Sequence, residues 1–143
     1  MATRATYQIT TFANTSTIYV HHDGYPEGAA EYFRNTLELM RISKRECSRD
    51  FVPAFLWANE KSMLTNSHEE HGDTEWRYNI KRVKNPDSVV PWKDISDTLM
   101  WAVEVWKRNY DTTTPSTISF KKVEERRLSD FIAQNIGNSN PWG

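Results

Sequence analysis

The stretch TIYVHHDGYP, residues 17–26, holds the end of a strand, a turn and the start of a helix. Ile18 and Val20 alternate with other residues, which is the period-2 pattern of a strand with one buried face. Gly24 interrupts this pattern, because glycine adopts backbone angles that other residues avoid. Pro26 suits a first helical turn, since its φ is fixed and its missing N–H is not needed there. The segment therefore predicts a strand–turn–helix unit with two histidines and an aspartate at the junction.

The same segment resembles the signature of a known protein family. Residues 18–26 are similar to the pattern Ile-Tyr-x-His-x-Asp-Gly-Tyr-Pro, which marks small, largely uncharacterised proteins encoded by phages and mobile elements. The residues that carry the signature are His21, Asp23, Gly24, Tyr25 and Pro26. As in that family, a strand that opens with Thr-Arg precedes the signature, whereas His22 stands where the family often has Trp. The resemblance implies a phage or mobile-element origin and a compact α+β fold, but no particular reaction.

Length and composition indicate one globular domain. The 143 residues are enough to bury a hydrophobic core, and we expect a domain over residues 1–137 and a flexible tail over residues 138–143. A net charge of −1 disfavours both a general nucleic-acid binder and an acidic mimic of DNA. The lone Cys47 fits a reducing compartment, and no apolar run is typical of a signal peptide or membrane span. We therefore expect a cytoplasmic protein of the bacterial host cell, with no membrane partner.

Alternating hydrophobicity predicts most of the strands. In residues 75–83, Trp76, Tyr78 and Ile80 point to one side, while basic and amide residues point to the other. Residues 99–108 fit either a strand or a helix, and their β-branched and aromatic content favours the strand. Turn residues between the first two predicted strands favour a hairpin. The predicted strands are residues 4–12, 18–21, 75–83, 99–108 and 117–121.

Hydrophobic periodicity predicts the helices. The clearest pattern spans residues 26–44, a second helix follows Asp50 as its N-cap, and a third ends before Gly137. Their expected buried residues are Ala30, Phe33, Leu37 and Met40 in the first, Phe51, Val52, Phe55 and Leu56 in the second, and Val123, Leu128, Phe131, Ile132 and Ile136 in the third. Together the elements predict an α+β fold, with a mainly antiparallel sheet of about four or five strands and about three helices packed on one face.

The four histidines fall into two short clusters whose residue types suit a metal. His21 and Asp23 share one face of an extended strand, and His68 and His71 lie in residues 65–74, a polar stretch that predicts a loop. Two histidines and a carboxylate are typical ligands of zinc, manganese or iron(II). The spacing of the second cluster is one residue short of the zincin motif, which excludes that site. We favour a solvated loop for the second cluster and a hydrogen bond between His21 and Asp23, with no cofactor. A metal or acid–base site is the alternative.

Basic and aromatic residues on the later strands define a second candidate surface. Arg77 and Lys81 lie on the side of their strand away from its apolar residues, and Lys107 is expected beside them. With Trp106 and Tyr110 at their flank, these cations would hold phosphates while the rings stack on bases. The near-neutral net charge instead favours ordinary surface charges offset by acidic neighbours. Nucleic-acid binding is therefore an alternative rather than our first expectation.

Aromatic residues are abundant, with six Trp, six Tyr and six Phe. Trp and Tyr are the commonest anchors of protein interfaces. We expect Trp76 and Trp101 to belong to the core, because they fall within the predicted apolar stripes. The tryptophans that fall outside those stripes, and are therefore candidate anchors, are Trp57, Trp92, Trp106 and Trp142.

These features and the family resemblance favour binding over catalysis. We expect a small phage-encoded inhibitor that occludes a surface of a host protein or nucleoprotein complex, in the manner of an anti-CRISPR counter-defence protein. One alternative is a metal- or small-molecule-binding enzyme that uses His21 and Asp23, and another is a nucleic-acid-binding accessory protein. The sequence leaves open whether two copies form a homodimer through a sheet edge.

Overall fold

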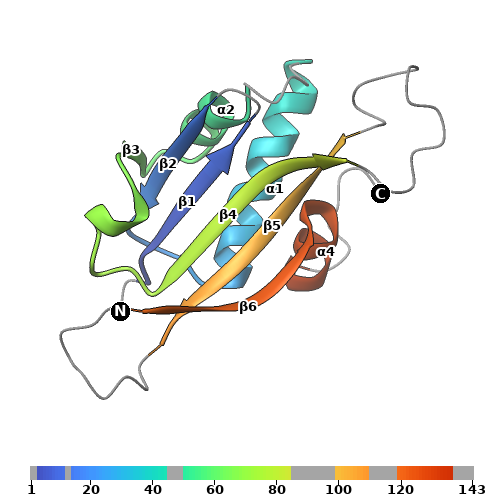
Figure 1. Cartoon of the computed structure of the whole chain (residues 1–143). Helices are drawn as coiled ribbons and strands as arrows, with labels where there is room; N and C mark the ends of the chain where they lie inside the picture. Colours follow the sequence, from blue (N-terminus) through green and yellow to red (C-terminus); the bar gives the residue numbers. More distant parts are fainter. Residues whose placement is uncertain (1–2, 12–13, 45–49, 85–98, 110–118, 137–143) are drawn as a thin grey trace.

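The computed structural model describes residues 3–11, 14–44, 50–84, 99–109 and 119–136 (Figure 1). The elements, in chain order, are β1 (Ala5–Thr10), β2 (Thr15–Val20), α1 (Pro26–Ile42), α2 (Phe51–Ala58), β3 (Ser62–Thr65), the short 3-10 helix η2 (His68–Glu70), β4 (Trp76–Lys84), β5 (Leu99–Arg108), β6 (Phe120–Arg127) and α4 (Leu128–Ile136).

One sheet organises these elements. The strand order is β3-β2-β1-β4-β5-β6, and every neighbouring pair is antiparallel except β1 and β4. A parallel pair needs a long crossover, and the segment that contains α1 and α2 supplies it. The predicted α+β class and the hairpin of β1 and β2 are confirmed. The sheet has six strands rather than four or five, since the short edge strand β3 was not predicted.

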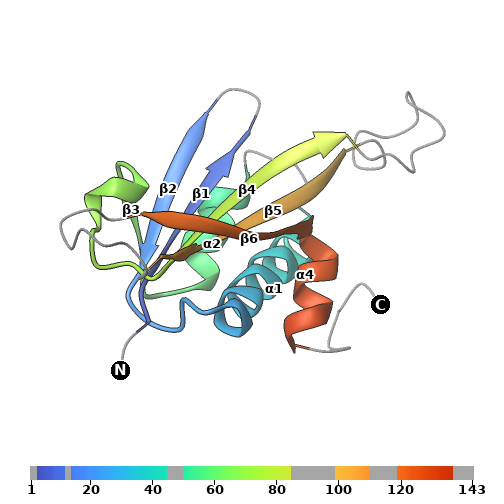
Figure 2. The same ribbon diagram turned by 60° about the horizontal axis from the view of Figure 1, so that its bottom comes forward.

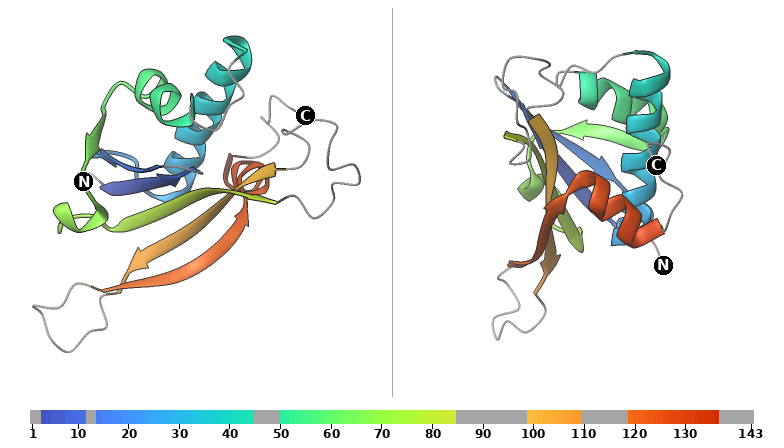
Figure 3. Two further views of the ribbon diagram at one scale, coloured as in Figure 1. Left: turned by 45° about the horizontal axis from the view of Figure 1, so that its top comes forward. Right: turned by 90° about the vertical axis from the view of Figure 1, so that its right-hand side faces the viewer.

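The three described α-helices pack on one face of the sheet (Figures 2 and 3). α1 lies between the other two and contacts both α2 and α4. This side, which holds Tyr7 and Tyr78, is called the helix face. The opposite side, towards which Thr6, Asn79 and Trp106 point by strand alternation, is called the open face. Among the described elements, only η2 folds onto the open face.

Aromatic rings fill the space between the sheet and the helices. Tyr7 of β1 and Tyr78 of β4 are opposite each other, and their stacked rings have centroids 4.9 Å apart. Phe33 of α1 packs edge-on against both rings, and Phe131 of α4 packs against Phe33 and Tyr78. Such pairs each contribute about 0.5–1.5 kcal/mol beyond the area they bury. The cluster therefore fixes α1 and α4 on the central strands.

The first two helices agree with the hydrophobic pattern. α1 begins at Pro26, as predicted, and α2 begins directly after Asp50, although that side chain makes no capping hydrogen bond. Trp76 and Trp101 pack against the core, as predicted. The buried residues of the two helices include Ala30, Phe33, Met40, Phe51 and Phe55.

The end of the chain differs from the prediction. β6 runs from Phe120 to Arg127, beyond the predicted residues 117–121, and α4 begins only at Leu128. Val123 therefore lies on a strand with 49% of its surface exposed, instead of lining a helix. Cross-strand pairing is the reason, because Lys122 bonds to Glu104 of β5 and a charged edge strand needs no apolar stripe. Within α4, Phe131 and Ile132 are buried as predicted.

The tail over residues 138–143, Cys47 and Gly137 lie outside the described residues. Among the helices of the described segments, none is both long and apolar enough to cross a membrane.

Candidate functional site

The signature turn, residues 21–28, is anchored through its backbone. Gly24 donates its N–H to the Thr3 carbonyl oxygen at 2.8 Å, and its own carbonyl accepts the Tyr78 hydroxyl at 2.6 Å. Burial raises the pKa of Tyr78 well above its usual value, so the hydroxyl remains a donor. A Cβ at Gly24 would lie 2.6 Å from the Cβ of Ala5, so a side chain there would push the turn away from β1. Glycine is therefore required by packing at this position.

The other residues of the turn are also held by close packing and hydrogen bonds. Asp23 has a φ of 57°, and a Cβ at Gly28 would lie 1.9 Å from its carbonyl oxygen. The Tyr25 hydroxyl donates to Asp23 Oδ1 at 3.2 Å, and the Tyr32 hydroxyl donates to the His22 carbonyl at 2.8 Å. Burial and the charge of Asp23 raise the pKa of Tyr32 to about 12, which keeps that donor protonated. The turn is thus held from both the sheet and α1.

His21 joins the start of β1 to the end of β2. Arg4 Nε donates to His21 Nδ1 at 3.1 Å and also lies 3.0 Å from Asp73 Oδ2. The Tyr19 hydroxyl lies 3.1 Å from the same imidazole nitrogen and donates to Asp73 at 3.3 Å. An arginine N–H only donates, so His21 Nδ1 accepts and its ring proton is on Nε2. The partners of His21 are therefore Arg4 and Tyr19, rather than the expected Asp23.

His68 belongs to a chain of hydrogen bonds across the open face. Thr6 Oγ1 lies 2.6 Å from His68 Nδ1, and His68 Nε2 lies 2.8 Å from Asn79 Oδ1. Asn79 Nδ2 and Lys122 Nζ both donate to Glu104, at 3.3 and 3.2 Å. Ionised Glu104 only accepts, so Asn79 turns its amide nitrogen to Glu104 and its oxygen to His68. The proton of neutral His68 is therefore on Nε2, and Thr6 donates to Nδ1.

This arrangement corrects the prediction of a solvated loop at His68. η2 folds onto β1, which leaves the residue only 8% exposed. Burial lowers the pKa of His68 below 6.5 and keeps the ring neutral at pH 7. Burial alone would raise the pKa of Glu104, but hydrogen bonds from Asn79 and Lys122 outweigh it and bring that pKa below 4.5. The amide of Asn79 is thus hydrogen-bonded to a neutral imidazole on one side and to a carboxylate on the other.

His71 has its own partners. Its ring stacks on Tyr19 with centroids 3.9 Å apart, and its Nε2 lies 2.9 Å from Thr65 Oγ1. His68 and His71 therefore do not converge on one point, as a shared metal would require. Within the described residues, no group of three or more His, Cys, Asp or Glu is placed to hold a metal ion.

The predicted basic surface is divided between the two faces of the sheet. Arg77 and Lys81 of β4 lie on the open face, and Lys81 Nζ is 3.4 Å from a Glu104 carboxylate oxygen. Lys107 lies on the helix face, with its Nζ 5.4 Å from the centroid of the Trp76 ring. Its expected position beside Arg77 is therefore wrong. The alternation along β5 carries the signal, because odd-numbered residues there share the helix face with the buried Val103 and Val105.

Trp57 lies on a different surface. Of the candidate anchors, Trp57 is 79% exposed and Trp106 is half-buried on the open face. Trp92, Trp142 and Tyr110 lie outside the described residues. Trp57 belongs to α2, whose Phe51 and Phe55 are fully buried, so one short helix presents apolar residues in both directions.

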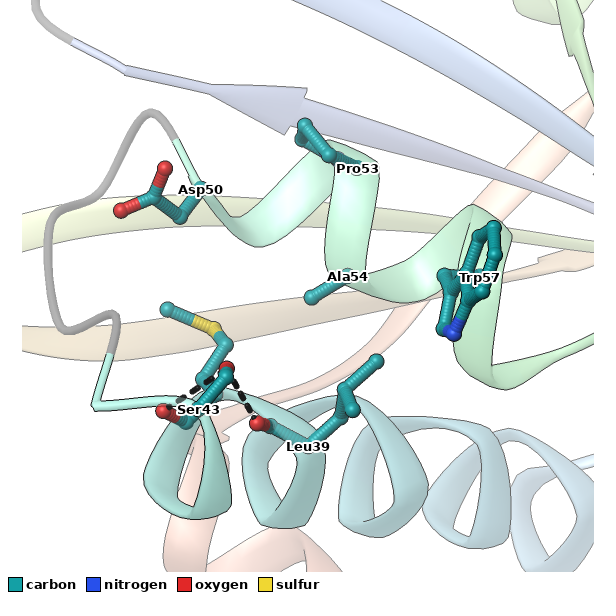
Figure 4. Close-up of a pocket in the computed structure, with 7 residues that line it drawn as sticks. Leu39, Ser43, Asp50, Pro53, Ala54 and Trp57 are labelled. Carbon is teal, nitrogen blue, oxygen red and sulfur yellow. Dashed lines mark hydrogen bonds between the residues drawn. The ribbon is translucent and has the colours of Figure 1, made fainter.

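A cavity of about 360 Å³ opens between α1 and α2 (Figure 4). Ser43 lies at its edge and donates to the Leu39 carbonyl oxygen at 2.6 Å, so its hydroxyl is already bonded. Asp50 alone among the lining residues is charged. The apolar lining, called the α1–α2 patch below, consists of Leu39, Met40, Pro53, Ala54 and Trp57.

Most of this patch was missed by the sequence reasoning, which singled out only Trp57. A signal was present: α2 has the sequence FVPAFLWA, with no polar residue in eight. A helix that buries a single face needs apolar residues on only part of its circumference. The additional apolar residues of α2 indicate that part of the helix surface is both apolar and exposed.

Comparison of the chain with protein-family models, with curated proteins and with solved structures finds no match. Its function is therefore inferred from the chemistry of its own surfaces: the signature turn, the open face and the α1–α2 patch.

Proposed function

We propose that this protein is a small binding inhibitor, which docks on a protein of a bacterial host and occludes that protein's surface through the α1–α2 patch. The observation that carries the proposal is Trp57, which is 79% exposed beside an apolar cavity. Trp and Met are enriched in the centres of protein interfaces, and buried Trp residues are frequent hot spots. The assignment to a phage and to counter-defence rests on the resemblance of residues 18–26.

The chemistry of the patch favours a protein segment as its occupant. The lining offers apolar contact, and the Ser43 hydroxyl is already bonded to its own helix. A small polar ligand would therefore find little to recognise. The carboxylate of Asp50 lies at the same cavity. The partner segment that fits is an apolar side chain in the cavity, with a basic residue beside it and a surface that covers the Trp57 indole.

The enzymatic alternative has less support. His21 and Asp23 bond to different neighbours, and His68 uses both ring nitrogens in the hydrogen-bond chain. A general base needs a lone pair that reaches a substrate, and these partners occupy the Nδ1 atoms of both rings. The polar groups of the signature turn are thus better explained by folding than by chemistry.

The nucleic-acid alternative is weakened by charge pairing. Lys81 and Lys122 share the carboxylate of Glu104, and Lys107 lies on the other side of the sheet. A surface that binds phosphates along a strand needs several cations whose charge is not already offset. Arg77 on this face pairs with the exposed Glu69, 3.9 Å away, and this weakly paired cation does not by itself make a nucleic-acid groove.

The test has two stages. The tagged protein is first purified from a nuclease-treated bacterial host extract, and a stoichiometric companion is identified by mass spectrometry. Binding is then measured between the two purified proteins for wild type, Trp57→Ala and the control Val123→Ala, which truncates an exposed residue on β6. We expect Trp57→Ala to weaken binding at least about 30-fold, or about 2 kcal/mol, and Val123→Ala and His21→Ala to leave it unchanged.

Three results would contradict the proposal. The protein could emerge from the extract alone, or Trp57→Ala could bind as tightly as wild type. The wild type could also elute as a dimer that Trp57→Ala converts to a monomer, in which case a second copy of the chain occupies the patch. Circular dichroism of each variant shows whether a loss of binding reflects a loss of fold.

A further inference from the structure

We propose that the open face carries a binding site for an oxyanion, a phosphate or carboxylate group on a small ligand. The site is a cavity of about 250 Å³ where η2, β4, β5 and β6 meet, on the side of the sheet opposite the α1–α2 patch. The proposal therefore stands independently of the proposed function. The residues that line the cavity are His68, Arg77, Asn79, Trp106 and Phe120.

Two hydrogen-bond donors of this lining are left without acceptors. Arg77 Nε and Trp106 Nε1 are buried and have no hydrogen-bond partner among the described residues. A buried donor without a partner is destabilising, and both of these groups can only donate. Arg77 and Trp106 are directly opposite each other on β4 and β5, so their Cβ atoms are about 5 Å apart. One group with two acceptor oxygens can therefore serve both donors.

The charge of Arg77 is also poorly compensated. Its guanidinium lies over the Phe120 ring at 3.9 Å, which holds it in place without neutralising it. The ion-pair partner is Glu69, whose Oε1 is 3.9 Å from Arg77 Nη1 and whose side chain is 76% exposed. An ion pair with an exposed partner at that distance contributes little to stability. Burial lowers the pKa of Arg77 more than the charge of Glu69 raises it, and the positive charge of Arg108 lowers it further, so an anion in the cavity would favour the charged form.

The remaining walls decide the kind of ligand. His68 and Asn79 bond to each other and to Thr6 and Glu104, so they shape the cavity and do not offer free metal-binding atoms. The volume of about 250 Å³ lies below the roughly 300–1,000 Å³ typical of cofactor and drug sites. A group of a few atoms that carries the anion fits this space, and a dinucleotide does not.

The indole N–H of Trp106 provides a direct readout. The full-length chain is labelled with ¹⁵N, and the Trp106 indole resonance is identified by its loss in Trp106→Phe. Inorganic phosphate, adenosine monophosphate and benzoate are titrated at constant ionic strength, with chloride as the reference. We expect a saturable downfield shift of this indole proton, because its N–H gains an acceptor. The comparison of phosphate, nucleotide and benzoate shows which group and which carrier the site prefers.

Arg82 offers a matched control. It lies on the same strand as Arg77 and also stacks on an aromatic ring, with its guanidinium carbon 4.9 Å from the centroid of Trp101, but on the helix face. Arg77→Gln should abolish the titration, Arg82→Gln should preserve it, and Arg77→Lys should weaken it about tenfold, because lysine keeps the charge but lacks the planar fork.

Two results would overturn the site. One is an indole resonance of Trp106 that none of the three probes moves at millimolar concentration. The other is a titration that persists in Arg77→Gln. If Arg77→Gln fails to fold, calorimetric titration of Trp106→Phe replaces it, since this variant keeps an aromatic side chain and lacks the N–H donor. Unchanged affinity in Trp106→Phe would then count against the proposal.

Discussion

The signature turn and the α1–α2 patch are built from opposite kinds of residue, and in both the structure differs from what the residue types suggest. The turn contains histidines, an aspartate and tyrosines, which suggest chemistry. Yet its backbone and side chains bond to Thr3, Arg4, Tyr78 and α1. The patch is made of ordinary apolar residues that suggest core, yet Trp57 is 79% exposed. A functional surface is therefore better sought where groups lack partners than where reactive residue types cluster.

The largest effect is expected from a side chain placed inside the turn. In Gly28→Ala the new Cβ would lie 1.9 Å from the Asp23 carbonyl oxygen, so the turn must shift away from α1. We expect the free energy of unfolding to fall by about 3 kcal/mol or more, measured by urea denaturation. Glu31→Ala, at an exposed position of the same helix, should change it by less than about 0.5 kcal/mol. Equal stabilities of the two variants would show that the turn is pliable and remove its structural role.

The next effect concerns the hydroxyl that holds the turn to the sheet. Tyr78→Phe removes the donor to the Gly24 carbonyl and leaves that oxygen buried, which should cost about 1–3 kcal/mol. Tyr7→Phe is a close control, because Tyr7 stacks on Tyr78 and its equally buried hydroxyl has no partner among the described residues. That variant should be neutral or slightly stabilised in the same denaturation experiment. If both variants lose stability equally, the hydrogen bond to Gly24 does not fix the turn.

The sequence predicted the parts of the fold that depend on local pattern. Alternation placed Trp76, Tyr78 and Ile80 on one face of β4, and helical spacing placed Ala30 and Phe33 in the core. The strand β3 was not predicted, because the four residues of this edge strand show no clear alternation of hydrophobicity and its Met63 and Leu64 are exposed. The parallel pairing of β1 with β4 was not predicted either, since it is set by tertiary packing rather than by the sequence of either strand.

The candidate sites were only partly predictable for the same reason. Trp57 could be identified because it falls outside the apolar stripe of its helix. The burial of His68 could not be predicted, because it depends on contacts with Thr6 and Asn79, which come from distant parts of the chain. The pairing of Arg77 with Trp106 likewise depends on the register between β4 and β5, which the sequence of neither strand reveals.

A smaller, pH-dependent effect on the free energy of unfolding is expected from His68. This residue has a structural role on the open face, as His21 has in the signature turn. Its pKa is lowered by burial, so between that folded value and 6.5 the unfolded chain binds more protons than the folded one. Stability therefore falls as the pH drops through this range, with a slope of at most about 1.4 kcal/mol per pH unit for one proton. Denaturation of wild type and His68→Gln from about pH 8 to 5.5 measures this slope.

The difference between those two proteins is the informative quantity. Above about pH 7.5 His68 is neutral in both the folded and the unfolded chain, so it should contribute no slope there. The lowered pKa of Glu104 acts only in a more acidic range, near and below 4.5, and does not enter this window. Slopes that are equal for wild type and His68→Gln between pH 8 and 5.5 would mean that His68 titrates as freely as a solvated loop residue.

The smallest effect on stability is expected at Trp57, and it separates the patch from the turn most clearly. Truncation to alanine removes a ring that is 79% exposed, and alanine is the better helix former, so the free energy of unfolding should change by less than about 0.5 kcal/mol. Phe55→Ala, on the same helix but fully buried, should cost about 3–5 kcal/mol. A loss of about 2 kcal/mol or more in Trp57→Ala would mean that the indole is packed in the folded protein. Its exposure, and with it the reason to place a partner there, would then be lost.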